Sequence, residues 1–375
     1  MLAVRKTDDV LILYPVAGGA PTIIPLQYPA GGAKWLPDQS GLVLTTSDST
    51  TGPWQVWIKP LPTGKSQRLT NDLDTYLSPS VTSDGALIAA VQIQTSLTIF
   101  VAPASKPDQG MPIRTGKSEG TGLIWTRGTG TLLSQSQAGE FSSLTPDGKE
   151  RVALFKDEAI DFNLCGDAHL ILNRWKGDSG TIWLSDMAGR SAKQLTDGTF
   201  DHAADCSPDG KSVIFIRRVG SHHQLFKRDT LESTPKQVSK REDLYFAGLR
   251  YSPNGRSIAD IEYDDNDNGT LVIRNAETGE PAKSFAMPAG YEPPWGSLQW
   301  ILRWTPDGKT LTYALWKGLG SPTNLWSQSV AGGPPRQITN FPDSVIAYDW
   351  SPDGKQLAYT RSSSTRDVVL ISNIR

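Results

Sequence analysis

Several features are scarce in this chain of 375 residues, and each shortage excludes a class of protein. With only two cysteines, Cys165 and Cys206, the chain cannot have a framework of several disulfides, and we predict buried free thiols at both positions. No run approaches the roughly 20 apolar residues of a membrane-spanning helix, so we expect no membrane insertion. The 37 basic residues are balanced by 39 acidic ones, which leaves no positive field for a nucleic acid. The fold must therefore come from the packing of the chain itself.

A Pro-Asp-Gly turn, by contrast, recurs along the whole chain. The string WSPDGKQLAYT begins at Trp350, WTPDGKTLTYA at Trp304 and CSPDGKSVIFI at Cys206. In such a turn Pro fixes φ, Asp bonds to its own backbone and Gly takes a positive φ. Weaker copies complete eight repeats, with the leading residues Trp35, Val81, Trp125, Cys165, Cys206, Tyr251, Trp304 and Trp350. Successive leading residues lie 40 to 53 positions apart, which is the period of a four-stranded propeller blade.

Each repeat contains further β-rich segments after its turn. Examples are IWLSDM at 182–187 and LWSQSV at 325–330, each followed by a hairpin signal and then by KQLT or RQIT. No segment long enough to form a helix repeats its apolar residues with the 3.6-residue period of a helix. We therefore expect four short strands in each repeat and an all-β fold.

These motifs carry a family resemblance. The combination W-[ST]-P-D-G-K-x-L-x-Y, then I-W, then P-R-Q-[LI]-T resembles the propeller repeat of TolB-type and WD-repeat-like proteins over the whole chain. The order of the repeats and the ending S-T-R-D-V-V-L-I-S-N resemble more narrowly the C-terminal sensor propeller of bacterial membrane-anchored serine/threonine kinases. The resemblance implies a sensor region outside the cytoplasm. It implies no kinase activity, because the H-R-D, D-F-G and glycine-rich nucleotide motifs are absent from this sequence.

The predicted fold class is a single closed β-propeller of four-stranded antiparallel blades, with eight blades and seven as the alternative. One domain is expected to cover residues 1–375. Each end of the chain offers three strand candidates, so six strands compete for the four places of one blade. We predict that residues 1–30 and 345–375 jointly form this closing blade, and that the turn aspartates are structural.

Three motifs that suggest chemistry have simpler explanations. Gly116-Lys117-Ser118-Glu119-Gly120 satisfies the nucleophile pattern G-x-S-x-G, but a strand follows it and not a helix. The segment 264–269 resembles the first half of a calcium loop, yet Asn275 replaces the required Glu, so we expect a polar hairpin cap and keep calcium as the alternative. His222 and His223 are adjacent on a strand and point to opposite faces, which makes them poor joint metal ligands. We therefore expect no catalytic residue, metal or cofactor.

The segments between successive repeats should emerge around one mouth of a central channel and form a composite binding surface. Aromatic side chains there offer a large contact area at a low entropic cost. The candidate ligand- or partner-binding residues are Tyr76, Tyr245, Tyr291, Trp295, Trp300, Asp74, Asp201, Asp243 and Asp343, with Phe200 and Phe246 in the same segments. The alternative is that these aromatic residues pack between loops.

Two classes of function are compatible with these features. The first is a non-catalytic binding or sensor propeller, as a fragment or homologue of a receptor-kinase sensor region or of a TolB-like protein. The second is a propeller hydrolase with a metal or substrate site in the channel. We expect the first, with a protein or small-molecule ligand, a monomeric chain and an extracytoplasmic, periplasmic location.

Overall fold

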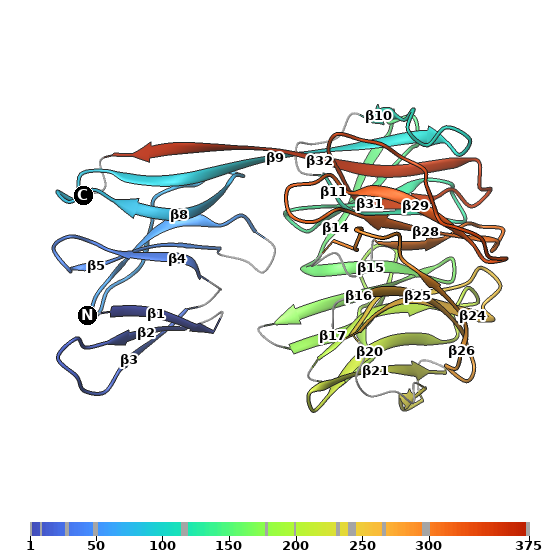
Figure 1. Cartoon of the computed structure of the whole chain (residues 1–375), viewed down its shortest axis with the longest axis horizontal. Helices are drawn as coiled ribbons and strands as arrows, with labels where there is room; N and C mark the ends of the chain where they lie inside the picture. The colour runs from blue at the N-terminus through green and yellow to red at the C-terminus, as the bar shows by residue number, and fades with distance from the viewer. Residues whose placement is uncertain are drawn as a thin grey trace. The chain divides into compact units, whose positions relative to one another are not determined.

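The computed structural model describes residues 2–7, 10–26, 30–47, 52–113, 119–176, 179–198, 200–229, 233–238, 245–264, 268–294 and 301–372. Only the backbone is described for 2–7 and 245–247. Within these ranges every regular element is a β-strand, and the strands form eight sheets, most of them four-stranded and antiparallel (Figure 1). This confirms the predicted fold class, an all-β propeller of four-stranded blades, and the number of sheets equals the number of repeats.

The chain divides into two compact units, Met1–Ser96 with Ser364–Arg375 and Leu97–Ser363, which are described separately. The one five-stranded sheet is divided between the two units and is counted once in each, so the first unit holds three sheets. Their strands are β1 (Leu2–Thr7), β2 (Val10–Tyr14) and β3 (Thr22–Pro25); β4 (Ala30–Trp35), β5 (Gly41–Thr46), β6 (Gln55–Pro60) and β7 (Gln67–Arg68); and β8 (Thr75–Val81) with the first half of β9 (Ile88–Pro103) and the second half of β32 (Gln356–Ile371).

The second unit holds six sheets. One joins β31 (Ser344–Trp350), the first half of β32, the second half of β9 and β10 (Met111–Ile113). The next two sheets contain β11 (Glu119–Trp125), β12 (Leu132–Ser136), β13 (Glu140–Leu144) and β14 (Arg151–Lys156), and then β15 (Ala159–Cys165), β16 (His169–Lys176), β17 (Ser179–Asp186) and β18 (Lys193–Gln194). Two further sheets contain β19 (Asp201–Cys206), β20 (Val213–Val219), β21 (His222–Arg228) and β22 (Lys236–Gln237), and then β23 (Tyr245–Tyr251), β24 (Ser257–Tyr263), β25 (Gly269–Asn275) and β26 (Pro281–Ala286). The last sheet contains β27 (Leu302–Trp304), β28 (Thr310–Leu315), β29 (Asn324–Ser329) and β30 (Arg336–Gln337).

The turn after each leading residue ends the first strand of its sheet. All eight predicted leading residues are the last residues of such strands, namely of β4, β8, β11, β15, β19, β23, β27 and β31. In the turn after Cys206, the Asp209 carboxylate accepts hydrogen bonds from the Ser207 hydroxyl (2.6 Å) and from the Lys211 N–H (3.1 Å). These bonds lower the pKa of Asp209, and Gly210 takes the positive φ of 75° that an L side chain disfavours. The turn aspartate is therefore structural, as predicted.

Large side chains at or near the leading positions tie several neighbouring sheets of the second unit together. The Trp304 indole N–H donates to the Arg250 carbonyl (3.3 Å), and the Trp125 indole N–H donates to the Asp349 carbonyl (3.1 Å). The Tyr348 hydroxyl donates to the Thr312 carbonyl of the adjacent sheet (2.6 Å). Successive first strands contact one another from β11 to β27, and β31 contacts β11. These six sheets thus follow one another in the order of the chain, with the sheet of β31 beside that of β11.

The described strands near the two chain ends lie in different sheets. The joint closing blade from residues 1–30 and 345–375 stays a prediction. Among the described residues, β31 and the first half of β32 share a sheet with β9 and β10, and β1, β2 and β3 form a sheet of their own. The repeat pattern defines which segments are strands, but it does not define which equivalent strand a segment pairs with.

Candidate functional site

The predicted binding residues gather at one end of their sheets. Because each first strand ends at its Pro-Asp-Gly turn, the start of that strand lies at the opposite end, which we call the mouth end. Asp201 begins β19, Asp343 directly precedes β31, and Asp74 directly precedes β8. The structure therefore places these acids at or just before the start of the first strand in three sheets, two of them in the second unit.

An acid–arginine pair at the mouth end recurs in the second unit. The Asp201 carboxylate, which is fully buried, accepts two hydrogen bonds from Arg217 on β20 (2.7 and 2.8 Å). Asp157 accepts from Arg174 (3.0 Å), and Asp343 accepts from Arg361. Each pair joins the start of a first strand to the end of the second strand in the same sheet. These acids therefore hold the mouth end of their own blades together.

The corresponding acid of the first unit has a neutral partner. Asp74 accepts hydrogen bonds from the side-chain amides of Gln92 (2.6 Å) and Gln94 (3.2 Å). The hydroxyl of Tyr76, which is buried, donates to Asp72 (2.6 Å). Burial and this neighbouring carboxylate raise the pKa of Tyr76. Tyr76 is thus a packed residue of its blade.

The remaining predicted residues are only partly described by the structure. Tyr291 packs edge-on against Trp326, with 4.8 Å between ring centroids, and the Lys317 ammonium lies 5.0 Å from its ring centre. Tyr245 is the first residue of β23, but its side chain is outside the described part. The predicted residues Asp243, Trp295 and Trp300 also lie outside the described residues, as does Phe246 beyond its backbone.

A cluster of aromatic and histidine rings, only partly anticipated, occupies the mouth end between two sheets. Phe200 meets Trp175 edge-on (4.6 Å between centroids) and His202 at 5.4 Å. His223 lies 5.6 Å from Phe200, and its Nδ1 is 3.3 Å from Nε2 of His202. The Arg218 guanidinium stacks 4.2 Å from the Phe200 ring centre. We call these five residues the aromatic cluster.

Sequence reasoning missed most of this cluster because its members come from different strands. Only Phe200 stood out, through its place in the segment between two repeats. The sequence favours an exposed position for His223, whereas it is half-buried against Phe200. Burial lowers the pKa of His202 to about 3, and the nearby His223 adds to this shift. His202 is thus neutral at physiological pH and acts as a buried aromatic ring with two polar nitrogens.

Buried charges lie on successive first strands of the second unit. Asp205, Arg250, Arg303 and Asp349 each precede a leading residue on four successive first strands, and all four are largely buried. The Asp205 carboxylate accepts a hydrogen bond from the N–H of Tyr251 (2.6 Å) in the next sheet. In the same way Asp349 accepts from the N–H of Trp125 (2.8 Å). These two carboxylates therefore link neighbouring blades.

Asp161 is a further buried acid near these charges. Its side chain is 6% exposed, and its Oδ1 atom has no hydrogen-bond partner among the described residues. Burial raises the pKa of Asp161 to about 8, against the opposing charges of Arg250 and Arg303. The carboxyl group is therefore mostly protonated at neutral pH and can donate a hydrogen bond.

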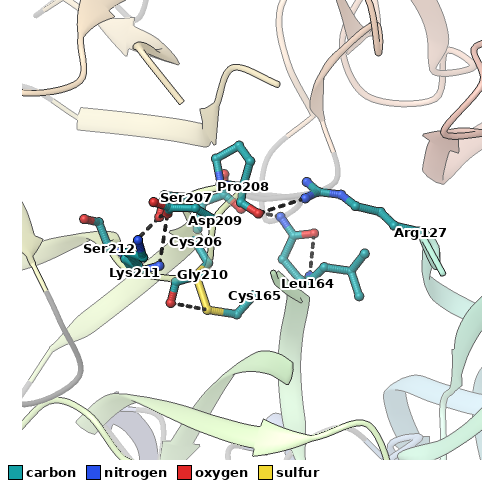
Figure 2. The surroundings of a disulfide bond; sticks show 12 residues. Arg127, Leu164, Cys165, Cys206, Ser207, Pro208, Asp209, Gly210, Lys211 and Ser212 are labelled. Carbon is teal, nitrogen blue, oxygen red and sulfur yellow. Dashed lines mark hydrogen bonds between the residues drawn. A yellow bond between two sulfur atoms is a disulfide. The ribbon is translucent and has the colours of Figure 1, made fainter. Parts of the chain in front are cut away.

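The prediction of free thiols was wrong, because Cys165 and Cys206 form a disulfide. Both are the last residues of first strands in adjacent sheets, and their Cα atoms are 5.0 Å apart, within the range of a disulfide. Figure 2 shows the bond beside the Ser207–Gly210 turn, where the Gly210 carbonyl lies near Cys165. The sequence placed the two residues on neighbouring strands but gave no distance between them.

Two other motifs can be followed only in part. Residues 116–118 of the G-x-S-x-G match lie outside the described residues. In the segment that resembles a calcium loop, the Asn268 backbone and side chain both donate to Asp264 (2.9 and 3.1 Å to Oδ1), as in a polar hairpin cap. Residues 265–267 between them are not described. No group of three or more metal-binding side chains and no helix able to cross a membrane is found in the described part of the chain.

Grooves of the second unit open on the turn side, away from the predicted mouth. One, of ≈ 540 Å³, lies between the sheets of β11–β14 and β15–β18. Another, of ≈ 520 Å³, lies between the sheets of β19–β22 and β23–β26, where Tyr251, Lys227 and Glu277 line it. Lys227 donates to Glu277 (2.7 Å), so the charges in this groove are already paired.

Comparison with known proteins supports the fold. No protein-family model matches the chain. The putative TolB from Agrobacterium tumefaciens is similar in structure, with a TM-score of 0.58 and 15% identity, over 72% of this chain and 99% of that one. The C-terminal WD40 domain of Sif2 gives a TM-score of 0.41 and 9% identity over 88% of this chain and 94% of that one. At such identities the TolB likeness shows a propeller fold and nothing further.

One curated protein shares a short stretch of sequence. The uncharacterized peptidase YuxL of Bacillus subtilis (strain 168) is 38% identical over 60 residues. This stretch is 16% of the present chain and 9% of that protein. The chain thus covers less than a tenth of the length of this relative.

Proposed function

We propose that this protein is a non-catalytic binding or sensor propeller that recognises a protein or small-molecule ligand at the mouth end of its second unit. The aromatic cluster is the observation that carries the proposal. Trp175, Phe200 and His223 are each partly exposed, and Arg218 adds an exposed cation against Phe200. The resemblance of the repeats to receptor-kinase sensor regions and TolB-type proteins supports the same class of function.

The frame around the cluster suits binding. Arg217, one residue before Arg218, is fixed by two hydrogen bonds to Asp201, and the Arg218 N–H donates to the Phe200 carbonyl (3.1 Å). Rings that are already held in place lose little entropy on contact with a ligand. Trp and Arg are also common among residues that dominate binding energy. A rigid aromatic surface with one cation fits a ligand with apolar and anionic groups.

An extracytoplasmic location is part of the proposal, and the disulfide supports it. Structural disulfides persist in oxidising compartments such as the periplasm and are rare in the cytosol. Thiol titration of denatured protein made in the periplasm and in the cytosol tests this part. We expect no free thiol in the periplasmic protein, and two free thiols there would contradict the location. We also propose a monomer, to be measured by light scattering.

Replacement of Phe200 or Trp175 by Ala tests the binding surface. We expect each change to reduce at least tenfold the recovery of a specific partner from an extract of the source organism, with the unfolding midpoint nearly unchanged. Leu319→Ala is the control, because Leu319 is 95% exposed and far from the cluster in sequence. Full recovery of the partner with both cluster variants would show that the mouth end is not the binding surface.

A hydrolase is the second candidate, favoured by the 60-residue likeness to an uncharacterized peptidase. Incubation of the purified chain with a fluorophosphonate probe and with a library of fluorogenic peptides tests it. We expect neither labelling nor cleavage. Cleavage that co-purifies with the chain and is lost in Ser118→Ala would replace the binding proposal with the hydrolase.

A further inference from the structure

Two strands of this protein are unlike their counterparts in the other repeats. β9 and β32 are each 16 residues long, whereas the equivalent second strands β5, β12, β16, β20, β24 and β28 have five to eight residues. Those shorter strands turn back in a hairpin and pair with the third strand of the same repeat, as β28 does with β29. β9 and β32 instead remain single strands through the place of the hairpin, and they pair with each other.

The positions where these hairpins belong are polar and exposed. They are Gln94, Thr95 and Ser96 in β9, and Ser363, Ser364 and Thr365 in β32. Both segments contain serine, which favours turns and is not among the residues enriched in strands. The border between the two compact units falls at these same residues, after Ser96 and after Ser363. Each long strand therefore joins two strand segments across a sequence that is suited to a turn.

As a result, the two repeats exchange their third strands. The first half of β32 pairs with the second half of β9 in the second unit, where the Ala104 N–H donates to the Lys355 carbonyl (2.8 Å). Phe100 stacks on Tyr359 in the same sheet, with 5.5 Å between ring centroids. In this antiparallel register, the residue nine positions before Phe100, Val91, lies opposite the residue nine positions after Tyr359, Val368. In the first unit Val369 and Ile371 accordingly pack against the core that contains Ile88.

The exchange completes a repeated arrangement of an acid, an arginine and an aromatic ring. Arg217 pairs with Asp201 and stacks on Phe226 (5.2 Å), which is a third-strand residue of its own repeat. Arg361 pairs with Asp343 and stacks on Phe100 (4.9 Å), a residue contributed by the other repeat. If β32 folded back on itself, alignment of DVVLIS with NLWSQS would put Val369 where Phe100 lies. Arg361 also stacks on Phe341 of its own repeat (4.5 Å), and the second ring that Phe100 adds favours the exchange.

Chain entropy favours the opposite pairing. A hairpin would close a loop of about five residues within one repeat, whereas the exchanged pairing joins segments more than 250 positions apart in the sequence. Short local loops cost less entropy to close than long ones. The two pairings make nearly the same backbone hydrogen bonds, because each second strand gains one third strand in either case.

We propose that these two repeats form a conformational switch with two pairings, the exchanged one and one in which β9 and β32 each fold into a hairpin. In the hairpin pairing, β8, both halves of β9 and β10 form one complete four-stranded blade. Both halves of β32 then pair with each other beside β31. The turn-like segments at 94–96 and 363–365 are the hinges of this switch.

Two double-cysteine variants of the full chain detect the two pairings. Val91→Cys with Val368→Cys places thiols opposite each other only in the exchanged pairing. Thr360→Cys with Val368→Cys does so only in the hairpin, because eight residues of extended strand separate these positions by about 26 Å otherwise. The native cysteines are already bonded to each other and do not interfere. Mild oxidation followed by non-reducing electrophoresis and peptide mapping of the monomer band gives each fraction.

We expect both variants to form the intramolecular bond in part of the folded molecules. Phe100→Leu in each background should lower the exchanged fraction and raise the hairpin fraction at least twofold, because Arg361 loses one of its two stacked rings and keeps only Phe341. Phe226→Leu is the matched control, since it removes the equivalent ring from Arg217 without touching either hinge. Crosslinking of only one variant, or the same fractions after Phe100→Leu, would overturn the switch.

Discussion

The two units are built from the same repeat, but only the second completes all its blades. Each of its six sheets has four strands, whereas the described strands of the first unit make sheets of three, four and three. The consequence appears at equivalent third-strand positions. Ile182 in the second unit is fully buried, whereas Val368 in the first unit is 72% exposed. An apolar residue in a repeat is thus stabilising only where a fourth strand or a neighbouring sheet covers it.

The polar contacts differ between the units in the same way. The second unit fixes its mouth end with ion pairs such as Asp201–Arg217, and it holds the disulfide between two neighbouring sheets. The equivalent acid of the first unit, Asp74, has only the neutral amides of Gln92 and Gln94 as described partners. We therefore expect the first unit to unfold more easily, and the following predictions test this comparison in order of decreasing effect.

Removal of a core ring should give the largest effect. Phe215 is fully buried in the second unit, so Phe215→Ala should lower the free energy of unfolding by about 3–5 kcal/mol. Ile23→Ala in the first unit should cost less than about 0.5 kcal/mol, because Ile23 is largely exposed. Urea unfolding followed by circular dichroism measures both. Equal losses would mean that burial does not separate the units.

Removal of the disulfide should come next. Its two cysteines are 41 positions apart, and Cys165→Ala with Cys206→Ala should cost about 3 kcal/mol, because the unfolded chain regains the entropy of an open loop. Hydrogen exchange should accelerate in β15 and β19 and remain unchanged in β5 and β6. Faster exchange in both sets of strands would show that the units do not unfold separately.

The buried carboxyl Asp161 should make the second unit sensitive to rising pH. Its pKa is about 8 in the folded protein and about 3.8 when unfolded, so between these values only the folded state keeps the proton. The contribution of Asp161 to the free energy of unfolding is therefore complete below about pH 4 and is lost as the pH rises to about 8. Asp161→Asn cannot ionise and should gain about 2 kcal/mol over the wild type across this window. A constant difference from pH 4 to pH 8 would contradict the raised pKa.

His202 should give the opposite dependence on pH. Its pKa is about 3 in the folded protein and 6.5 when unfolded, so the unfolded state binds the extra proton between these values. Stability is therefore full above about pH 6.5 and is lost as the pH falls towards 3. His202→Gln should reduce this loss in the free energy of unfolding at acid pH by about 1–2 kcal/mol. Urea titrations at several pH values measure the slope, and an unchanged slope would refute a buried neutral His202.

The smallest expected effect is a gain in the first unit. Gln92→Arg would give Asp74 the cationic partner that Asp201 and Asp343 have, and we expect a gain of at most about 1 kcal/mol at low salt. The gain should fall in 0.5 M salt because the pair is partly exposed. Gln92→Met, which has no donor, is the control and should lower stability. A gain with both variants would mean that the acid is not involved.

Much of this fold could be predicted from the sequence, because its signals are local. Pro, Asp and Gly at fixed offsets specify a turn wherever they occur, so the end of every first strand was placed correctly, from Trp35 to Trp350. The structural role of the turn aspartates followed from the same chemistry. Of the predicted binding residues, Asp201 and Asp343 lie at the start of the first strands of their sheets, a position that depends only on the order of strands.

The remaining features depend on distances between repeats, which no local pattern encodes. Asp201 and Asp343 lie opposite arginines of their own blades, Cys165 lies within bonding distance of Cys206, and Phe200 meets His202 and His223 from another strand. Repeats with nearly the same sequence also offer interchangeable third strands, so Arg361 stacks on Phe100 of a distant repeat. The sequence by itself determined the strands and turns, since backbone geometry acts over a few residues. Only the tertiary structure decided which of the equivalent strands pair, because that choice depends on the packing of side chains brought together from the whole chain.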